Sequence, residues 1–362
     1  MDESDSLHWA PVPFAPAYLN RILALRNRMF SLIEGEYDGA TYRWKHLEGP
    51  EGGSCVSLAV DKTDPERVAA HYAMLPRQIR LGDSVFSSSQ PVDVFVDDTY
   101  AYRREGVFLR LAEMVHERER QGGRKFFFGF PNATSYPVFS GLLRFRSALK
   151  LYPYQVPLKV GFFTRRIPLM KVAGGLGPIG RLRLPRLTPL VRSQGYDVNE
   201  VREAGEGWTE FFEAASKQFP ISMIRNRAYV QWRYFSCPTK NYRVFEVRRA
   251  GRMVGLFVVA LIVKNEFAST AQCVDFLALD ETSWKATTRL MFSTLQNTDA
   301  ESCVTLLHPE NPVTPLFESL GFVRRKNMGH HFIVRNFTEP AEKVDCFDPK
   351  NWFLTPGDGD SF

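Results

Sequence analysis

The chain has 362 residues, of which 44% are hydrophobic and 13% aromatic, and its formal net charge is +6. This composition excludes a disordered, collagen-like or low-complexity protein. The length predicts two domains of ordinary size, each with its own core. A net charge this small does not by itself indicate a nucleic-acid-binding protein.

The cysteines and the apolar segments indicate the compartment. The five cysteines are scattered, and none forms a CxxC motif or a Cys/His pair at metal-ligand spacing. We therefore expect reduced thiols and no metal. The first residues are acidic rather than basic and apolar, unlike a signal peptide. The longest apolar run, Val254–Val263, is about half of what a spanning helix needs. We expect a cytoplasmic protein.

The first half, residues 1–150, has the pattern of an α/β domain. Apolar residues at helical spacing predict a helix over Tyr18–Ile33, interrupted by Arg26. Strands, a long helix, a strand and a short helix are expected to follow. The expected strands are Cys55–Val60, Val68–Leu75, Gln78–Phe86, Pro91–Val96 and Lys125–Phe130, and the expected helices are Arg103–Arg120 and Thr134–Leu143.

Residues 151–200 predict a basic, apolar linker that contains Gly and Pro. No Asp or Glu occurs between Leu151 and Tyr196, so this segment supplies all of the net positive charge. A solvated linker fits this pattern, and so does a surface for an anionic membrane or substrate across 159–192. Nucleic acid is not expected to bind there. The basic residues are Lys159, Arg165, Arg166, Lys171, Arg181, Arg183, Arg186 and Arg192.

Residues 201–336 predict a second α/β domain, and residues 337–362 predict an acidic tail. Asp358 and Asp360 in the tail favour a solvated segment over a cation site. The expected strands of the second domain are Tyr242–Arg248, Met253–Val263, Thr270–Leu279 and Ser302–Leu307, and its expected helices are Ser283–Leu295 and Val313–Leu320.

The two halves share a pattern of residues that predicts an internal repeat. YRWKHL, PVDVFVDD and the segment from Phe130 to Phe145 of the first half have counterparts in VQWRYF, CVDFLALD and the segment from His308 to Phe322. The repeat is too long for a solenoid, so each half is expected to be a domain. The matched pairs are Trp44 with Trp232, Asp93 with Asp275, Asn132 with Asn311 and Phe145 with Phe322.

The turn after Pro91–Val96 predicts a diphosphate site. Arg103, Arg104, Glu105 and Gly106 open a helix there. The start of a helix presents unpaired amides and a positive dipole, Gly lets a ligand approach the backbone, and arginines add positive charge. A basic helix start on the surface gives the same pattern without a ligand.

The order of these elements resembles the GNAT N-acetyltransferase superfamily, over roughly Tyr37–Arg335. Its acyl-CoA motif, Arg/Gln-x-x-Gly-x-Gly/Ala, is matched by Arg103 and Gly106, with Phe108 in place of the last small residue. The run from Phe130 to Ser135 and the terminal segment from Trp352 to Asp360 are similar to tandem GNAT proteins associated with polysaccharide biosynthesis, and this likeness implies, as an alternative to a solvated tail, one that docks near the site. The resemblance implies an α/β (α+β) fold class: two GNAT-like domains, each a mixed, mainly antiparallel sheet flanked by helices.

The resemblance also implies an N-acyltransferase that uses acetyl-CoA or another acyl-CoA. The acceptor would be a small molecule or saccharide amine, such as an amino sugar, and the protein could lie at the inner membrane face. The second half carries acids where phosphate would lie, so it is expected not to bind the cofactor. The implied cofactor residues are Val94, Phe95, Val96, Arg103, Arg104, Glu105, Gly106, Val107, Phe108, Asn132 and Ser135.

The catalytic acid and base are less well indicated. Asp93 is a candidate base, although its match to Asp275 also fits a structural role. Ser140 stands where many GNAT enzymes have an acidic Tyr, and Tyr136 lies one helical turn earlier. Two alternatives remain open: a FemAB-like transferase that uses aminoacyl-tRNA, and a non-catalytic protein that binds CoA or glycan.

Overall fold

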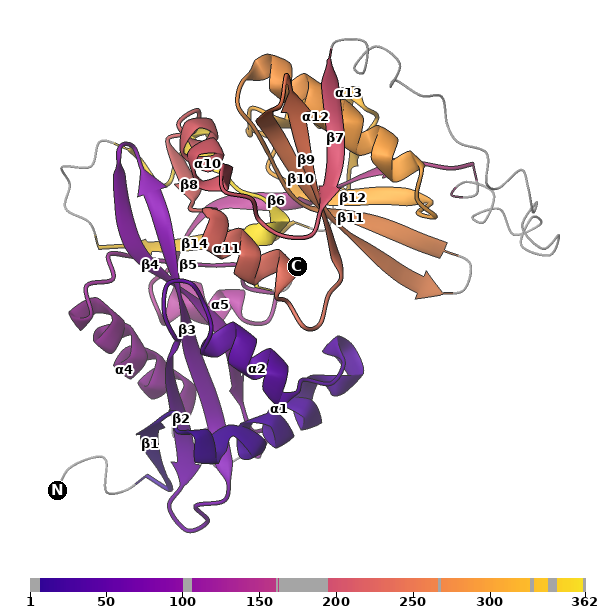
Figure 1. Cartoon of the computed structure of the whole chain (residues 1–362). Coiled ribbons are helices and arrows are strands. Elements are labelled where there is room, and N and C mark those ends of the chain that lie inside the picture. Colours follow the sequence, from indigo (N-terminus) through magenta and orange to yellow (C-terminus); the bar gives the residue numbers. More distant parts are fainter. Residues whose placement is uncertain are drawn as a thin grey trace. The chain divides into compact units, whose positions relative to one another are not determined.

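The computed structural model of the chain describes residues 7–99, 106–160, 162, 195–265, 268–325, 329–337 and 344–360. The chain divides into two compact units, neither of which is one continuous segment (Figure 1). Unit 1 contains Met1–Ala148, Ser236–Thr239 and Phe332–Lys343, and unit 2 contains Leu149–Phe235, Lys240–His331 and Val344–Phe362. Each unit is a mixed sheet with helices, which confirms the α/β fold class.

Unit 1 is built on a sheet with the strand order β1-β2-β3-β4-β5-β14. Neighbouring strands are antiparallel, except for the parallel pair β4 and β5. The bounds are β1 Trp9–Pro13, β2 Cys55–Asp61, β3 Val68–Leu81, β4 Ser84–Val96, β5 Phe126–Gly129 and β14 His330–Asn336.

Helices cover both faces of the unit 1 sheet. Helix α4 (Val107–Gln121) packs its apolar side against one face, in a core cluster that also contains residues of β3, of β5 and of α5 (Tyr136–Gly141). Helices α1 (Leu19–Glu34) and α2 (Gly39–His46) lie on the other face (Figure 1). The apolar spacing of each helix accounts for this arrangement, because only one side of each is suited to burial.

Unit 2 is built on a sheet with the strand order β6-β12-β11-β10-β9-β7, in which only β11 and β12 are parallel. A short strand, β13, also pairs with β6. The strands are β6 Arg146–Pro157, β7 Tyr196–Val201, β9 Tyr242–Arg249, β10 Arg252–Asn265, β11 Ala268–Ala278, β12 Ser302–Leu307 and β13 Val323–Arg324. The helices are α10 Trp208–Ser216, α11 Arg227–Val230, η3 Gln231–Phe235, α12 Glu281–Gln296 and α13 Thr314–Ser319.

The expected strand boundary at Gln78–Phe86 is wrong. Strand β3 continues through Pro76 to Leu81, and the chain turns at Gly82, whose φ of 58° suits glycine. The range Gln78–Phe86 therefore covers the end of β3, the turn at Gly82 and the start of β4. The range Pro91–Val96 is the last part of the same long β4.

Both ends of the expected linker are strands. Residues 151–157 belong to β6, and residues 196–200 belong to β7. Lys159 is described and is only 9% exposed. The other basic residues proposed for a membrane surface (Arg165, Arg166, Lys171, Arg181, Arg183, Arg186 and Arg192) lie outside the described residues.

Each of the two sheets contains one strand that comes from the opposite half of the chain. Strand β6 follows α5 in the chain but pairs with β12 of unit 2. Strand β14 follows the unit 2 elements but pairs with β5, and Figure 1 shows the two side by side. Each sheet is therefore completed by a strand from the opposite half of the chain.

The acidic tail is not a solvated segment. Strand β15 (Trp352–Phe353) pairs with β8 (Ile221–Met223), and Asp358 is fully buried. The Asp358 carboxylate accepts a hydrogen bond at 2.5 Å from Arg225, which also donates to Asp275 at 3.1 Å. Because Arg225 pairs with both carboxylates, none of these three buried charges is left without an opposite charge, which would be strongly destabilising.

No helix in the described part of the chain is long and apolar enough to cross a membrane. Within the same residues, no group of three His, Cys, Asp or Glu side chains is arranged to hold a metal ion.

Candidate functional site

The most unusual backbone in unit 1 is a bulge in β4 at Asp93. In the ladder with β3, His71 faces Phe95 and Ala73 faces Val92, so two β4 residues lie opposite one β3 residue. Asp93 has a φ of 47°, which is strained for a residue with a side chain. Bulges bend a strand and redirect its backbone groups, and they are frequent beside active sites.

Strand β4 also lacks a pairing partner along part of its other edge in the described part of the chain. Among the described residues, the ladder between β4 and β5 joins only Ser88 to Phe126 and Ser89 to Phe127. Beyond Ser89, the side of β4 toward β5 has no strand partner in the described part. Backbone donors and acceptors there are available to a ligand that lies along the strand.

The predicted cofactor residues of β4 use their side chains for packing. Val94 and Val96 pack against the core cluster under α4. Phe95 stacks on the ring of His71, with centroids 5.0 Å apart, on the opposite face. A ligand along this strand would therefore meet mainly the backbone of these residues.

The predicted diphosphate turn is described only from Gly106 onward, because Arg103, Arg104 and Glu105 lie outside the described residues. Gly106 precedes α4 with a left-handed φ of 63°, and among the described residues, its chain neighbours apart, no atom lies within 4 Å of a Cβ built there. The N-cap residue Gly106 has no side chain that could cap the first amides of the helix. Val107 is buried, and Phe108 packs against Tyr72.

The segment before α5 is a compact turn built by Asn132. Its side-chain oxygen accepts hydrogen bonds from the amide of Ser135 at 2.8 Å and from its hydroxyl at 3.0 Å. Tyr136 packs against the core cluster, while the Ser140 hydroxyl donates to the Tyr136 carbonyl at 2.8 Å. The predicted catalytic Ser140 thus has its proton engaged within its own helix.

The carboxylate of Asp93 receives three donors from α2 and the segment before it. Lys45 Nζ lies 2.8 Å from Oδ1, while His46 Nε2 and the Tyr37 hydroxyl lie 2.7 and 3.0 Å from Oδ2. Burial alone would raise the pKa of Asp93, but Lys45 and His46 outweigh burial and hold this pKa well below its usual range. Asp93 is therefore ionised and a weak base.

His71 fixes the backbone of the bulge. Its Nδ1 lies 2.6 Å from the Asp93 carbonyl oxygen, which can only accept, so Nδ1 donates. Its Nε2 then accepts from the Tyr42 hydroxyl at 3.1 Å. Burial, together with neighbouring His46, lowers the pKa of His71 to about 3 and keeps the ring neutral, as this pattern requires.

The sequence does not indicate directly the four residues that contact Asp93, which are Tyr37, Lys45, His46 and His71. A signal for His46 was present in the repeat. His46 follows Trp44 by two positions and contacts Asp93, and Tyr234 follows Trp232 by two positions and donates to Asp275 at 2.7 Å. Matched residues at matched spacing thus lead to the same contact in each unit.

Solved structures with the same fold include those of acyltransferases. A GCN5-related N-acetyltransferase from Anabaena variabilis has a TM-score of 0.64 at 10% identity, covering 91% of this chain and 73% of its own. A GCN5-related N-acetyltransferase from Kribbella flavida has a TM-score of 0.60 at 15% identity, covering 91% of this chain and 71% of its own. Saccharomyces cerevisiae N-myristoyltransferase with bound myristoyl-CoA has a TM-score of 0.62 at 12% identity, covering 94% of this chain and 82% of its own.

At these identities the likeness shows the fold alone, which is shared with GCN5-related N-acetyltransferases and N-myristoyltransferase. No protein-family model matches the sequence, and no curated protein matches it.

Proposed function

We propose that this protein is an N-acyltransferase that moves an acyl group from acyl-CoA to an amine. The observation that carries the proposal is the bulge at Asp93 in a β4 strand that separates from β5 beyond Ser89. A thioester arm lying along this strand would meet backbone groups without a strand partner in the described part, and the first turn of α4, whose N-cap residue is a glycine, would meet its diphosphate.

The residues proposed to hold acyl-CoA do so mainly through the backbone. The amides and carbonyls of Val94, Phe95 and Val96 would align the pantetheine arm, and an amide at the bulge would polarise the thioester carbonyl. The open space at Gly106 fits a diphosphate close to the backbone. The residues proposed around the diphosphate are Arg103, Arg104, Glu105, Gly106, Val107 and Phe108, with Asn132 and Ser135 near the arm.

The contacts of Asp93 favour a positioning role over proton abstraction. An ionised carboxylate that already accepts three hydrogen bonds has little affinity for an amine proton. It would instead hold α2 against the bulge. For protonating the leaving thiolate, Tyr136 is a better proposed donor than Ser140, whose hydroxyl is bonded to a carbonyl.

We also propose that the two units arose by duplication. In both, two helical segments precede antiparallel strands, a helix, a parallel strand and a short helix. The acids Asp280 and Glu281 at the start of α12 support loss of cofactor binding in unit 2. An amino sugar acceptor, a role in polysaccharide biosynthesis and contact of 159–192 with a membrane remain proposals from the sequence.

Calorimetric titration with acetyl-CoA and myristoyl-CoA tests the proposal. Gly106→Glu should abolish binding, since a carboxylate would occupy the diphosphate position. Gly123→Glu is the matched control, because Gly123 follows the other end of α4 with a φ of 86° and open space around its Cβ. Arg103→Ala should weaken binding about tenfold. Absence of binding by the wild type, or equal loss in both glycine variants, would refute the proposal.

The bond between Ser140 and Tyr136 favours one second candidate, a protein that binds acyl-CoA without turnover. A thiol-release assay across a panel of amines separates the two. Binding without release of CoA for any amine would favour the non-catalytic protein.

A further inference from the structure

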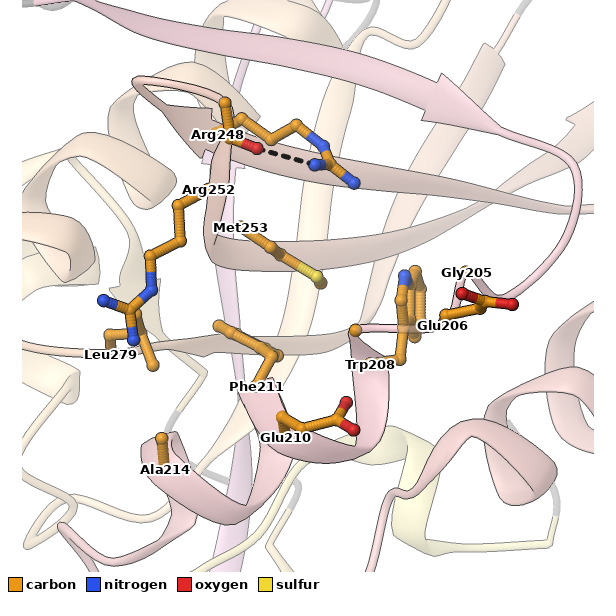
Figure 2. Close-up of a pocket in the computed structure, with 12 residues that line it drawn as sticks. Gly205, Glu206, Trp208, Glu210, Phe211, Ala214, Arg248, Arg252, Met253 and Leu279 are labelled. Carbon is orange, nitrogen blue, oxygen red and sulfur yellow. Dashed lines mark hydrogen bonds between the residues drawn. The ribbon is translucent and has the colours of Figure 1, made fainter.

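Unit 2 contains a cavity of about 320 Å³ that the proposed function does not use (Figure 2). It lies between the start of α10 and the turn that joins β9 to β10. Its apolar floor includes Phe211 and Met253, which are 5% and 8% exposed. This volume is at the small end of ligand pockets and suits a molecule the size of a dipeptide.

The wall of the cavity is held by a chain of hydrogen bonds. The buried Glu246 accepts from Trp208 Nε1 of α10 through one oxygen and from Arg248 Nε through the other, at 2.8 Å. Arg248 also donates to the Gly251 carbonyl at 2.8 Å, as Figure 2 shows. The helix and the turn are thus fixed to each other without a ligand, so the cavity is already formed.

The rim carries charges of opposite sign on opposite sides. Arg252 lies beside Leu279, whereas Glu206 and Glu210 lie near Trp208, with Phe211 and Met253 between them (Figure 2). The side chains of Arg252, Glu206 and Glu210 are exposed and have no hydrogen-bond or ion-pair partner among the described residues. Each of these groups is available to a ligand.

We propose that this cavity binds a dipeptide-sized zwitterion with an apolar body. Arg252 would pair with its carboxylate, Glu210 and Glu206 with its ammonium group, and Met253 and Phe211 would contact the body. The two charges must be separated by the apolar floor. An α-amino acid does not meet this condition, because its ammonium and carboxylate share one carbon.

The test is calorimetric titration of the full chain with Leu-Ala, N-acetyl-Leu-Ala, Leu-Ala amide and free leucine. Leu-Ala should bind, and removal of either charge should weaken binding at least about tenfold. Arg252→Gln should make the acid and the amide bind equally. Glu206→Gln combined with Glu210→Gln should make the free and acetylated peptides bind equally.

Matched controls are Arg289→Gln and Glu213→Gln, exposed residues of α12 and α10 outside the cavity. Neither should change binding. Gly207→Trp is a blocking variant, because Gly207 has an ordinary φ of −76° and open space at its Cβ. It should abolish binding while leaving the unfolding transition intact. No binding of Leu-Ala, equal binding of leucine, or unchanged selectivity in the charge variants would overturn the proposal. The proposed binding of acyl-CoA to unit 1 does not depend on any of these outcomes.

Discussion

At the scale of single residues, hydrogen bonds from neighbouring side chains hold Asp93 in its strained backbone conformation. Its carbonyl accepts from His71, and its carboxylate accepts from Tyr37, Lys45 and His46. A left-handed backbone costs roughly 1 kcal/mol or more, and four hydrogen bonds readily offset that cost. The bulge is therefore a stable feature of the unit before any ligand binds.

Replacing His71 by Leu should loosen the bulge. The Asp93 carbonyl and the Tyr42 hydroxyl would lose their partner, so we expect a loss of about 2 kcal/mol or more in unfolding free energy. CoA release with an accepted amine should slow by on the order of 100-fold, as for loss of an oxyanion donor. The affinity for acyl-CoA, measured by calorimetry, should change little.

His308→Leu is the matched control for His71→Leu. His308 is equally buried and its Nε2 lies 3.0 Å from the Trp352 carbonyl oxygen, but it belongs to unit 2 and not to the strands that form the bulge. It should lower stability without a comparable loss of rate. Similar rate losses in both variants would show that the effect of His71 is only one of stability.

At the scale of elements, local patterns predicted helices better than strand boundaries. Helix α4 has one apolar side, and this pattern is visible in the sequence. Strand β3, in contrast, is buried along most of its length and contains Pro76. A long buried strand lacks the alternation that marks strand ends, and a proline inside it resembles a break.

The candidate site was predicted only in part for a related reason. Val94 to Val96 and Gly106 belong to one continuous motif, so the sequence could indicate them together. Tyr37, Lys45 and His71 reach Asp93 from elements that lie far away in the chain, and only the fold brings them together.

The docked tail also makes a prediction at this scale. Asp358→Asn removes a charge-assisted hydrogen bond from Arg225, although Asp275 continues to pair with it. We expect a loss of about 2 kcal/mol in unfolding free energy, measured by urea denaturation. Glu213→Gln, an exposed acid of α10, should change stability by less than about 0.5 kcal/mol. Equal effects in the two variants would contradict a stabilising role for the tail.

At the scale of the whole molecule, several histidines are buried in the neutral state. Burial lowers the pKa of His71 and His116 to about 3 and that of His308 to about 4. Below about pH 6.5 the unfolded chain binds protons at these residues, whereas the folded chain does not. Their contribution to stability is therefore present above pH 6.5 and declines as the pH falls.

Urea denaturation at pH 7, 6 and 5 measures this dependence. Each such histidine should lower the unfolding free energy by up to about 1.4 kcal/mol per pH unit below its usual pKa. In the variant His116→Phe, the dependence of the unfolding free energy on pH should be weaker by the contribution of one histidine, because the phenylalanine side chain cannot bind a proton. A stability that stays constant between pH 7 and 5 would contradict the buried neutral state.

The exchange of β6 and β14 between the units bears on how the chain is synthesised. On the ribosome, the first half emerges before β14, so β5 lacks its partner strand until almost the whole chain has been made. An unpaired strand edge can pair with the wrong chain. Arrested chains that end before His330 should therefore depend on chaperones, and a cut within residues 163–194 cannot separate the two halves into complete sheets.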